Sequence, residues 1–522
     1  PRKEGQKKAL SMAYKNSGID PSTVELVEAH GTGTRVGDMV EFQALNEVFA
    51  DSGVKPQNCA IGSVKSMIGH TKAAAGSAGL IKAALSLYHK TLLPTIKAEA
   101  PDPNMGISGS PFYLNSSSRP WFSKKSSPRR CGVSSFGFGG SNFHAVLEEH
   151  DKVKRKTAWD GSVEIIAFSA SSHSELLKQV SDFKSRIEKD HSAGTIAFEA
   201  AGTRKNFSPA DQCRILFAAR KSHNSPDRSF EELPSLILKG LGIMETNRGK
   251  TEWDAGNIFY GENSNTGKIA FIFPGQGSQY VGMGRDLVCV FPEAFEALEK
   301  ANNIFSKQSL LTDYIYPIPD QSETGKRTQE EELRKTETAQ PAIGSVSMAM
   351  LKVLTRFGIK PDAVCGHSFG ELTALYAAGW IDPDTLIHLS VSRGRYMASS
   401  STGSGAMMAV NVPVSELESI INDTKVTLAN INSPDQSVLS GPKDAIEKAE
   451  QLCRQKGFST RILPVSAAFH TKQVENALKP FMQTLLNVSI SPTQIPVFSN
   501  TTGKSYPSDP GSVKKLLGEQ LL

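Results

Sequence analysis

The feature that most constrains the fold is the pentapeptide Gly-His-Ser-Phe-Gly at residues 366–370, because of the segments that flank it. Residues 363–365 are apolar and suit the end of a buried strand, and residues 372–380 read as an apolar helix. A Gly-x-Ser-x-Gly between a strand and a helix makes a sharp turn that exposes the serine. The five residues alone suit an ordinary helix-capping turn equally well. The flanking pattern and a downstream histidine favour a nucleophile, Ser368.

Two other segments could complete a site around that serine. The stretch Ala-Ala-Phe-His-Thr at residues 467–471 presents His470, the natural general base for Ser368. The apolar residues 269–273 predict a buried strand, and the glycine turn after it brings Gln276 towards the same end of the sheet. Backbone N–H groups of Gln276 and Phe369 could then stabilise an oxyanion. A plain strand-to-helix turn is the alternative for Gln276. No acidic residue occupies an evident triad position.

The rest of this segment supplies a carboxylate-binding candidate and a second subdomain. A helix over residues 390–397 carries Arg393 and Arg395, and a buried guanidinium could form a bidentate pair with a substrate carboxylate. For one arginine on a helix, an exposed position is the commoner alternative. Residues 317–338 are polar and are expected to form a solvated loop. Residues of about 405–466 follow a βαββαβ order, which predicts a ferredoxin-like subdomain.

Residues 1–150 form a separate Gly- and Ala-rich α/β block with two histidines on glycine-flanked turns. A lone histidine is more often structural than catalytic. His30 and His70 together, with Lys65 near the second, are harder to explain structurally. Two neutral imidazoles can hold an enolate or thioester oxyanion, and Lys65 can fix their tautomers and charge.

Length and composition bound the remaining possibilities. The chain has 522 residues, which suggests roughly three domains. The polar residues 151–260 are expected to form a small α/β linker domain without a catalytic constellation. Six scattered cysteines without a C-x-x-C pair argue against a metal site or disulfides and favour a reducing, cytoplasmic compartment. No apolar run reaches the ~20 residues of a membrane helix, and no basic stripe indicates nucleic acid.

The first block resembles the C-terminal half of a β-ketoacyl synthase. The resemblance rests on His-Gly-Thr-Gly-Thr at residues 30–34, Gly-His-Thr-Lys-Ala-Ala-Ala-Gly at 69–76 and Phe-Gly-Phe-Gly-Gly at 136–140. It implies a thiolase-like fold in which His30 and His70 assist malonyl decarboxylation and condensation, Lys65 supports them, and Phe138 gates the acyl pocket. None of the six cysteines has the Cys-Ser-Ser setting of the family's nucleophile. We therefore expect no condensation by this chain alone.

Residues of about 268–522 resemble a malonyl-CoA:acyl-carrier-protein transacylase domain, through the motifs around residues 275–279, 366–371, 392–395 and 468–470. The resemblance implies an α/β-hydrolase-like core with Ser368 as acyl acceptor, His470 as base and Arg393 as carboxylate clamp. It also makes Gln276 and Phe369 the oxyanion donors. His367 is placed among the substrate-binding residues, and the bulky Phe469 resembles the malonyl-selective subgroup. The family's final strand and helix are expected to lie past residue 522.

The order of ketosynthase half (1–150), linker (151–260) and acyltransferase (261–522) is similar to type I polyketide synthases and polyunsaturated fatty acid synthases. It implies that the chain loads malonyl from malonyl-CoA onto the phosphopantetheine of an acyl carrier protein, with no covalently bound cofactor. Dimerisation through a complete ketosynthase is expected by analogy. Two alternatives remain: a serine hydrolase of acyl thioesters, and a catalytically silent scaffold that docks carrier proteins. The product and its chain length stay open.

Overall fold

The structure is a computed structural model that describes residues 2–98, 100–123, 127–137, 139–190, 192–222, 230–263, 267–305, 309–320, 322–400, 405–463 and 475–521. The chain forms two compact units. One contains Pro1–Thr157 together with Lys268–Leu522, and the other is Ala158–Gly267. The sequence predicted separate domains over residues 1–150 and 261–522, whereas in the structure these two regions pack into one compact unit. The stacked rings of Phe122 and Phe295, with centroids 4.4 Å apart, are part of that packing.

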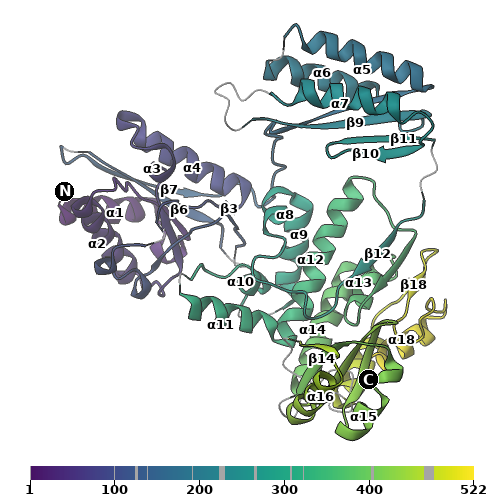
Figure 1. Cartoon of the computed structure of the whole chain (residues 1–522). Coiled ribbons are helices and arrows are strands. Elements are labelled where there is room, and N and C mark those ends of the chain that lie inside the picture. The colour runs from purple at the N-terminus through teal and green to yellow at the C-terminus, as the bar shows by residue number, and fades with distance from the viewer. Residues whose placement is uncertain are drawn as a thin grey trace. The chain divides into compact units, whose positions relative to one another are not determined.

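The N-terminal region is built on a five-stranded sheet with helices on both faces (Figure 1). The strand order is β4-β2-β1-β6-β7, and only the β6–β7 pair is antiparallel. Helices α1 and α2 share one core with the sheet, and α4 shares another. The elements are α1 (Lys3–Ser17), β1 (Leu26–Glu28), α2 (Arg35–Asp51), β2 (Cys59–Gly62), α3 (Lys65–Ile68), α4 (Ala75–His89), β3 (Thr91–Leu92), β4 (Phe112–Leu114), β5 (Arg119–Pro120), β6 (Arg130–Phe136) and β7 (Asn142–Glu148).

The C-terminal region has a parallel sheet of order β12-β13-β18 packed against helices. Its core joins all three strands to α9, α12, α13 and α14. The predicted strands at 269–273 and 363–365 are present, while β18 was not predicted. The elements are β12 (Ala270–Phe273), α8 (Arg285–Val290), α9 (Pro292–Phe305), α10 (Leu311–Ile315), α11 (Glu323–Arg334), α12 (Thr336–Arg356), β13 (Ala363–Gly366), α13 (Gly370–Ala377), α14 (Pro383–Ser400), α17 (Glu475–Leu486), β18 (Val497–Phe498) and α18 (Pro510–Glu519).

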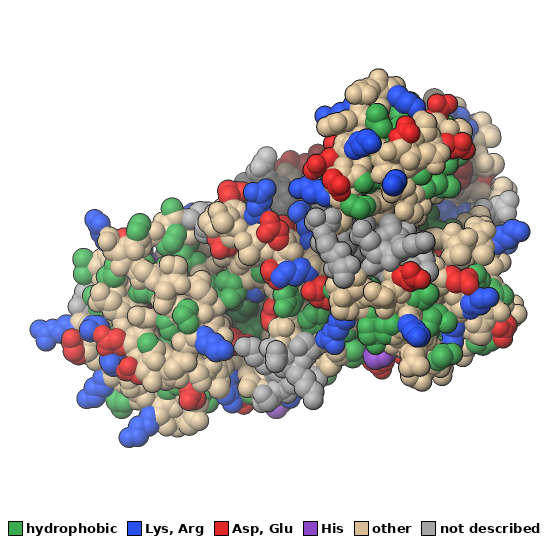
Figure 2. Space-filling view, turned by 90° about the horizontal axis from the view of Figure 1, so that it is seen from below, with side chains coloured by type: hydrophobic (Ala, Val, Ile, Leu, Met, Phe, Trp, Pro, Cys, Tyr) green, Lys and Arg blue, Asp and Glu red, His purple; other side chains and the backbone are tan. Residues whose placement is uncertain are grey.

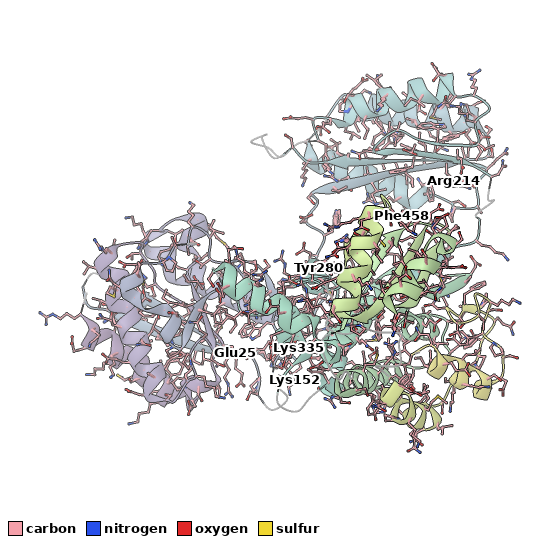
Figure 3. All side chains as sticks on the ribbon, turned by 60° about the horizontal axis from the view of Figure 1, so that its bottom comes forward. Glu25, Lys152, Arg214, Tyr280, Lys335 and Phe458 are labelled. Atoms are coloured by element: carbon pink, nitrogen blue, oxygen red, sulfur yellow. The ribbon has the colours of Figure 1, made fainter. Side chains whose placement is uncertain are left out.

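The loop predicted over residues 317–338 is wrong, because this stretch contains the helix α11. Ser322 caps the helix by accepting the Gly325 N–H at 3.0 Å, and Glu323 lies in the first turn, where a negative charge suits the helix dipole. Leu333 is its only buried residue. At the junction with α12, Lys335 pairs with Glu332 at 2.6 Å (Figure 3). A helix this polar lacks the apolar repeat by which sequence patterns are recognised.

A four-stranded antiparallel sheet of order β15-β16-β14-β17 lies within the C-terminal region. Its elements follow the predicted βαββαβ order: β14 (Gly405–Asn411), α15 (Glu418–Thr424), β15 (Thr427–Ser433), β16 (Gln436–Pro442), α16 (Lys443–Gln455) and β17 (Ser459–Ile462). The two helices share a separate core with the sheet, against which Phe458 packs from the residue before β17 (Figure 3).

The unit Ala158–Gly267 has its own sheet and its own core. The sheet order is β10-β11-β9-β8, and α5, α6 and α7 cover one of its faces (Figure 1). In α5, Leu176, Val180, Phe183 and Ile187 recur at helical spacing and are all fully buried. The elements are β8 (Val163–Ala170), α5 (His173–Ile187), α6 (Ala193–Asn206), β9 (Cys213–Arg220), α7 (Leu233–Thr246), β10 (Glu252–Asp254) and β11 (Ile258–Glu262).

Among the described residues, none of the helices has both the length and the apolar character needed to cross a lipid bilayer. Lys and Arg side chains are interspersed with Asp and Glu over the face of the molecule shown in Figure 2. This mixture agrees with the small formal net charge of +5.

Candidate active site

Ser368 lies in the sharp turn between β13 and α13, as the sequence predicted. Its φ of +50° is in the left-handed region, which is unusual for a residue with a side chain. The glycines on either side permit the turn because a Cβ on Gly366 would lie 2.0 Å from the carbonyl carbon of Gly370. A Cβ on Gly370 would lie 2.3 Å from the carbonyl oxygen of Phe273 on β12. The Gly-x-Ser-x-Gly pattern is therefore required by close backbone contact.

Hydrogen bonds from two other segments hold this turn. The His367 N–H donates to the carbonyl oxygen of Phe273 at 2.9 Å. The Ser368 N–H donates to Oδ1 of Asn500, just after β18, at 2.7 Å. Asn500 in turn donates its Nδ2–H to the carbonyl oxygen of Gly366 at 2.8 Å. The serine turn is thus fixed against both neighbouring strand ends.

A buried carboxyl group lies directly behind the turn. Glu371, in the first turn of α13, is fully buried and accepts the Asn500 N–H and, at 2.8 Å, the Tyr506 hydroxyl. Burial raises the pKa of Glu371 to about 7, although these hydrogen bonds and the charge of Arg393 act in the opposite direction. Glu371 holds the loop after β18 against the serine turn.

Arg393 is the buried member of the two candidate arginines. It is 2% exposed on α14 and donates to Oε1 of Gln340 at 2.9 Å and to Oε1 of Gln520 at 3.2 Å. Burial lowers its pKa to about 10, while the charge of Glu371 raises it, so the guanidinium stays positive at neutral pH. Arg395 donates instead to the carbonyl oxygen of Phe305 at 2.8 Å.

Gln276, the predicted oxyanion residue, is linked to Arg393 through side-chain hydrogen bonds with residues of α12. Its Oε1 accepts the Thr336 hydroxyl at 2.6 Å and the Nε2–H of Gln340 at 3.4 Å. Gln340 is the residue whose Oε1 binds Arg393. The structure thus brings Gln276 and Arg393 together through two polar residues on α12 that the sequence reading missed.

The remaining predicted residues of this site divide into three cases. Phe369 is fully buried, with its ring against Gly344 on α12. His367 is exposed, and its Nε2 lies 3.2 Å from Oδ1 of Asn432 on β15, which connects the turn to the small antiparallel sheet. His470 and Phe469 lie outside the described residues.

The structure brings together the two histidines of the N-terminal region. The rings of His30 and His70 meet edge to face with centroids 5.7 Å apart. The Lys65 ammonium donates to the carbonyl oxygen of His30 at 2.5 Å, so it binds the main chain. The pKa of His30 is lowered to about 4 by burial and by the charges of Lys65 and His70, which keeps its imidazole neutral at pH 7. Phe138 lies outside the described residues.

The tautomer of His70 is fixed by the main chain. Its Nδ1 accepts the Lys72 N–H at 3.0 Å, which leaves the proton of the neutral ring on Nε2. Behind His30, Glu41 on α2 accepts the N–H groups of His30 at 2.7 Å and of Gly31 at 2.9 Å. The charge of Lys65 therefore acts on the pKa of His30, whereas its hydrogen bond to the main-chain carbonyl does not fix the tautomer of either ring.

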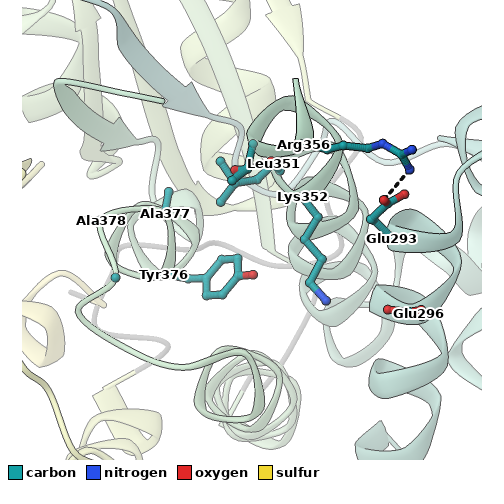
Figure 4. Close-up of a pocket in the computed structure, with 10 residues that line it drawn as sticks. Glu293, Glu296, Leu351, Lys352, Arg356, Tyr376, Ala377 and Ala378 are labelled. Carbon is teal, nitrogen blue, oxygen red and sulfur yellow. Dashed lines mark hydrogen bonds and ion pairs between the residues drawn. The ribbon is translucent and has the colours of Figure 1, made fainter. Parts of the chain in front are cut away.

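A cavity of about 600 Å³ opens elsewhere in the C-terminal region, between α9, α12 and the end of α13 (Figure 4). Its lining mixes charges of both signs, and an ion pair joins Arg356 to Glu293. None of the predicted site residues lines it. Within the described part of the chain, no group of three or more His, Cys, Asp or Glu side chains could hold a metal ion.

Three family models match successive parts of the chain. Residues 1–99 match the C-terminal domain of β-ketoacyl synthases, residues 101–206 match the ketoacyl-synthetase C-terminal extension, and residues 270–515 match the acyl transferase domain. The first and third matches contain the histidine pair and the serine turn, respectively.

Curated relatives align with nearly the whole chain. One polyunsaturated fatty acid synthase component, from Thraustochytrium sp., is 33% identical over 98% of this chain and 19% of its own length. A mycoketide-CoA synthase of Mycobacterium tuberculosis is 33% identical over 98% of this chain and 12% of its own. A pikromycin polyketide synthase component of Streptomyces venezuelae is 30% identical over 96% and 30%. The chain spans less than a third of each of these relatives.

Two solved acyltransferase domains share the fold. The acyl transferase domain of ZmaA aligns with a TM-score of 0.54 at 22% identity, over 70% of this chain and 78% of that domain. The acyltransferase domain of an iterative polyketide synthase in enediyne biosynthesis aligns with a TM-score of 0.50 at 21% identity, over 69% and 80%. The chain therefore contains a β-ketoacyl synthase C-terminal domain, the C-terminal extension and an acyl transferase domain, in that order, and over nearly its whole length it is similar to polyketide and polyunsaturated fatty acid synthases.

Proposed function

We propose that the acyl transferase domain moves a malonyl group from malonyl-CoA, through Ser368, to the phosphopantetheine thiol of an acyl carrier protein. The observation that carries the proposal is the buried Arg393, whose charge acts on Glu371 behind the serine turn. Its hydrogen-bond partners among the described residues are two neutral amide oxygens. A buried cation held in this way suits a site that receives a carboxylate from the substrate, because a charge-assisted bidentate pair is stronger than two amide contacts.

The transfer has two symmetrical steps. His470 takes the proton of the Ser368 hydroxyl as Oγ attacks the thioester carbon, and the N–H groups of Phe369 and Gln276 stabilise the oxyanion. When the intermediate collapses, the C–S bond breaks and His470 returns the proton to the CoA thiolate. The pantetheine thiol then attacks the malonyl-serine ester in the same manner and regenerates the free hydroxyl. The bulky Phe469 is expected to favour malonyl over a methyl-branched unit, a preference of ~1–3 kcal/mol.

For the ketosynthase half, we propose that His30 and His70 hold the thioester oxyanion during decarboxylation and condensation. Burial and the charge of Lys65 keep His30 neutral, and Phe138 gates the acyl pocket. The neutral His30 ring supports this role. The nucleophile for condensation is expected from outside this chain. All six cysteines have a raised pKa, chiefly through burial, so none is a thiolate at neutral pH.

We also propose the fold of each region and the partners of the chain. The N-terminal sheet is half of a thiolase-like domain, the serine lies in an α/β-hydrolase-like core, and the small antiparallel sheet is a ferredoxin-like subdomain. Domain boundaries near residues 150 and 260 separate these parts. Acyl carrier protein is the partner, and dimerisation occurs through a complete ketosynthase. Six free cysteines support a reducing, cytoplasmic compartment.

Labelled malonyl-CoA tests the proposal. We expect the chain to gain one malonyl group by intact mass, to lose that gain in Ser368→Ala, and to pass the label to a carrier protein that bears phosphopantetheine. Arg393→Ala should reduce malonyl loading more strongly than acetyl loading. Rapid release of free malonate without labelling of the carrier would favour the hydrolase. A chain that acquires no acyl group would favour the docking scaffold.

A further inference from the structure

Asn500 makes three hydrogen bonds that together link the serine turn to the strand beside it. Its Oδ1 accepts the Ser368 N–H at 2.7 Å, and its Nδ2–H donates to the carbonyl oxygen of Gly366 at 2.8 Å. Its own main-chain N–H donates to the buried Glu371 carboxyl group. One side chain therefore bonds the main chain on both sides of His367, at the centre of the turn.

The backbone at Ser368 needs such support. A non-glycine residue with φ of +50° persists only where its surroundings fix it. The side chain that bonds it must offer an acceptor for the Ser368 N–H and a donor for the Gly366 carbonyl at the same time. An amide side chain offers both on the two atoms of one planar group, whereas an ionised carboxylate lacks the donor.

The loop that carries Asn500 is itself anchored. The Tyr506 hydroxyl donates to Glu371 at 2.8 Å, and the Ser499 N–H donates to the Lys504 carbonyl oxygen at 2.9 Å. The loop is thereby closed on itself and fastened to the first turn of α13. Asn500 reaches the serine turn from a preformed position.

We propose that Asn500 is a positioning residue for the nucleophile: it holds the main chain at Ser368 so that Oγ points at the thioester. It also occupies the N–H of Ser368 itself, so the oxyanion must be bound by other N–H groups, in agreement with Phe369 and Gln276. The inference rests on the proposed acyl transfer. Asn500 acts through Ser368 and need not touch the substrate.

Three variants of the full chain test the inference. Asn500→Ala removes both side-chain bonds, Asn500→Asp keeps the acceptor, and Thr502→Ala changes the same loop without touching the turn, because the Thr502 hydroxyl bonds the main chain of Lys504. With malonyl-CoA and a carrier protein, Asn500→Ala should lower kcat at least ~10-fold, since small errors in position cost large factors in rate. KM should stay within about twofold, because Arg393 still binds the malonyl carboxylate. Asn500→Asp should recover part of kcat, and Thr502→Ala should retain it.

A second readout separates this inference from the proposed function. The rate at which a fluorophosphonate labels Ser368 reports the nucleophile without any malonyl group, and it should follow the same order among the variants. If the wild type labels but does not transfer malonyl, the proposed function fails while the labelling rates still decide the role of Asn500. The inference is overturned if Asn500→Ala matches Thr502→Ala in either readout, or if Asn500→Asp is no better than Asn500→Ala.

Discussion

At the scale of single residues, the buried Glu371 makes the stability of the chain depend on pH. Its pKa of about 7 in the folded chain lies above the ordinary value of 4.5, so the folded state binds the proton more tightly than the unfolded state. The contribution of protonated Glu371 to the free energy of unfolding is fully present below pH 4.5 and is lost as the pH rises through 7. The difference amounts to about 3 kcal/mol at most, from 1.36 kcal/mol per pH unit.

We therefore predict that Glu371→Gln makes the chain less sensitive to pH. Relative to the wild type, the free energy of unfolding of the variant should rise by about 2.5 kcal/mol between pH 5 and pH 8, because glutamine has no proton to lose. Urea titrations at the two pH values measure this change. Glu332→Gln, which removes an exposed carboxylate, is the control. A difference between Glu371→Gln and wild type that does not vary with pH would contradict the prediction.

Candidate site residues could be recognised in the sequence where a local motif marks them. They were missed where they act through a contact with a distant segment of the chain. Ser368 and His30 are flanked by glycines that mark tight turns. Asn500 follows a two-residue strand that is too short for any periodicity, and it meets Ser368 across 132 positions of the chain. A polar residue just after an apolar stretch was the available signal, because the carboxyl ends of parallel strands meet at one edge.

At the scale of elements, the close approach of β12, β13 and α13 depends on glycine. We predict that Gly370→Ala destabilises the acyl transferase domain by at least about 4 kcal/mol or prevents its folding, because the added Cβ would lie 2.3 Å from the Phe273 carbonyl oxygen and backbone would have to move. Gly242→Ala in α7 is the matched control, since its Cβ meets nothing within 4 Å. The control should be neutral or more stable by up to ~1 kcal/mol. Equal stability of the two variants, measured by thermal melting, would refute the steric argument.

A buried ion cluster joins α4, β6 and β7 in the N-terminal region. Glu149, which follows β7, binds the ammonium of Lys90 at 2.8 Å and the guanidinium of Arg129 at 2.7 Å, and all three side chains are at most 2% exposed. Hydrogen bonds from these partners lower the pKa of Glu149 despite the opposing effect of burial. Its stabilising contribution is therefore present above the ordinary pKa and is lost as the pH falls through the lowered value.

Replacing Glu149 should leave the buried Lys90 without its ion-pair partner and Arg129 with only the longer contact to Glu299 at 3.9 Å. We predict that Glu149→Gln lowers the free energy of unfolding by about 3–5 kcal/mol at pH 7, as measured by urea denaturation. The adjacent Glu148→Gln removes a more exposed pair with Arg130 and should cost less than about 1 kcal/mol. Similar values for the two variants would show that the cluster is not a stabilising unit.

The elements also show where sequence patterns stop being informative. The alternating and helical apolar repeats predicted β12, β13 and the βαββαβ order of the small sheet, because burial of one face determines these elements. Helix α11 was missed because its stability comes from capping and charge placement, with one buried residue. β18 was missed because its two residues are ordered by the neighbouring strand β13.

At the scale of the whole molecule, composition and motif order predicted three regions, but not which regions share a unit. Residues 1–157 and 268–522 pack together through contacts such as Arg119 donating to the carbonyl oxygen of Tyr316 at 2.7 Å. Such pairings depend on surface complementarity between distant segments and leave no periodic signal. The unit Ala158–Gly267, by contrast, has a core whose members all lie between Ile166 and Tyr260.

This self-contained core predicts that residues 158–267 fold when expressed alone. Four strands and three helices bury one apolar cluster, so the unit needs no contact from the other one for its hydrophobic stabilisation. Circular dichroism should show cooperative thermal unfolding. Phe217→Ala, which empties a fully buried position, should lower the stability by about 3–5 kcal/mol, whereas Phe198→Ala, at a position that is 78% exposed, should change it little. A non-cooperative melt of the isolated unit, or equal effects of the two phenylalanine substitutions, would mean that its core is completed by the rest of the chain.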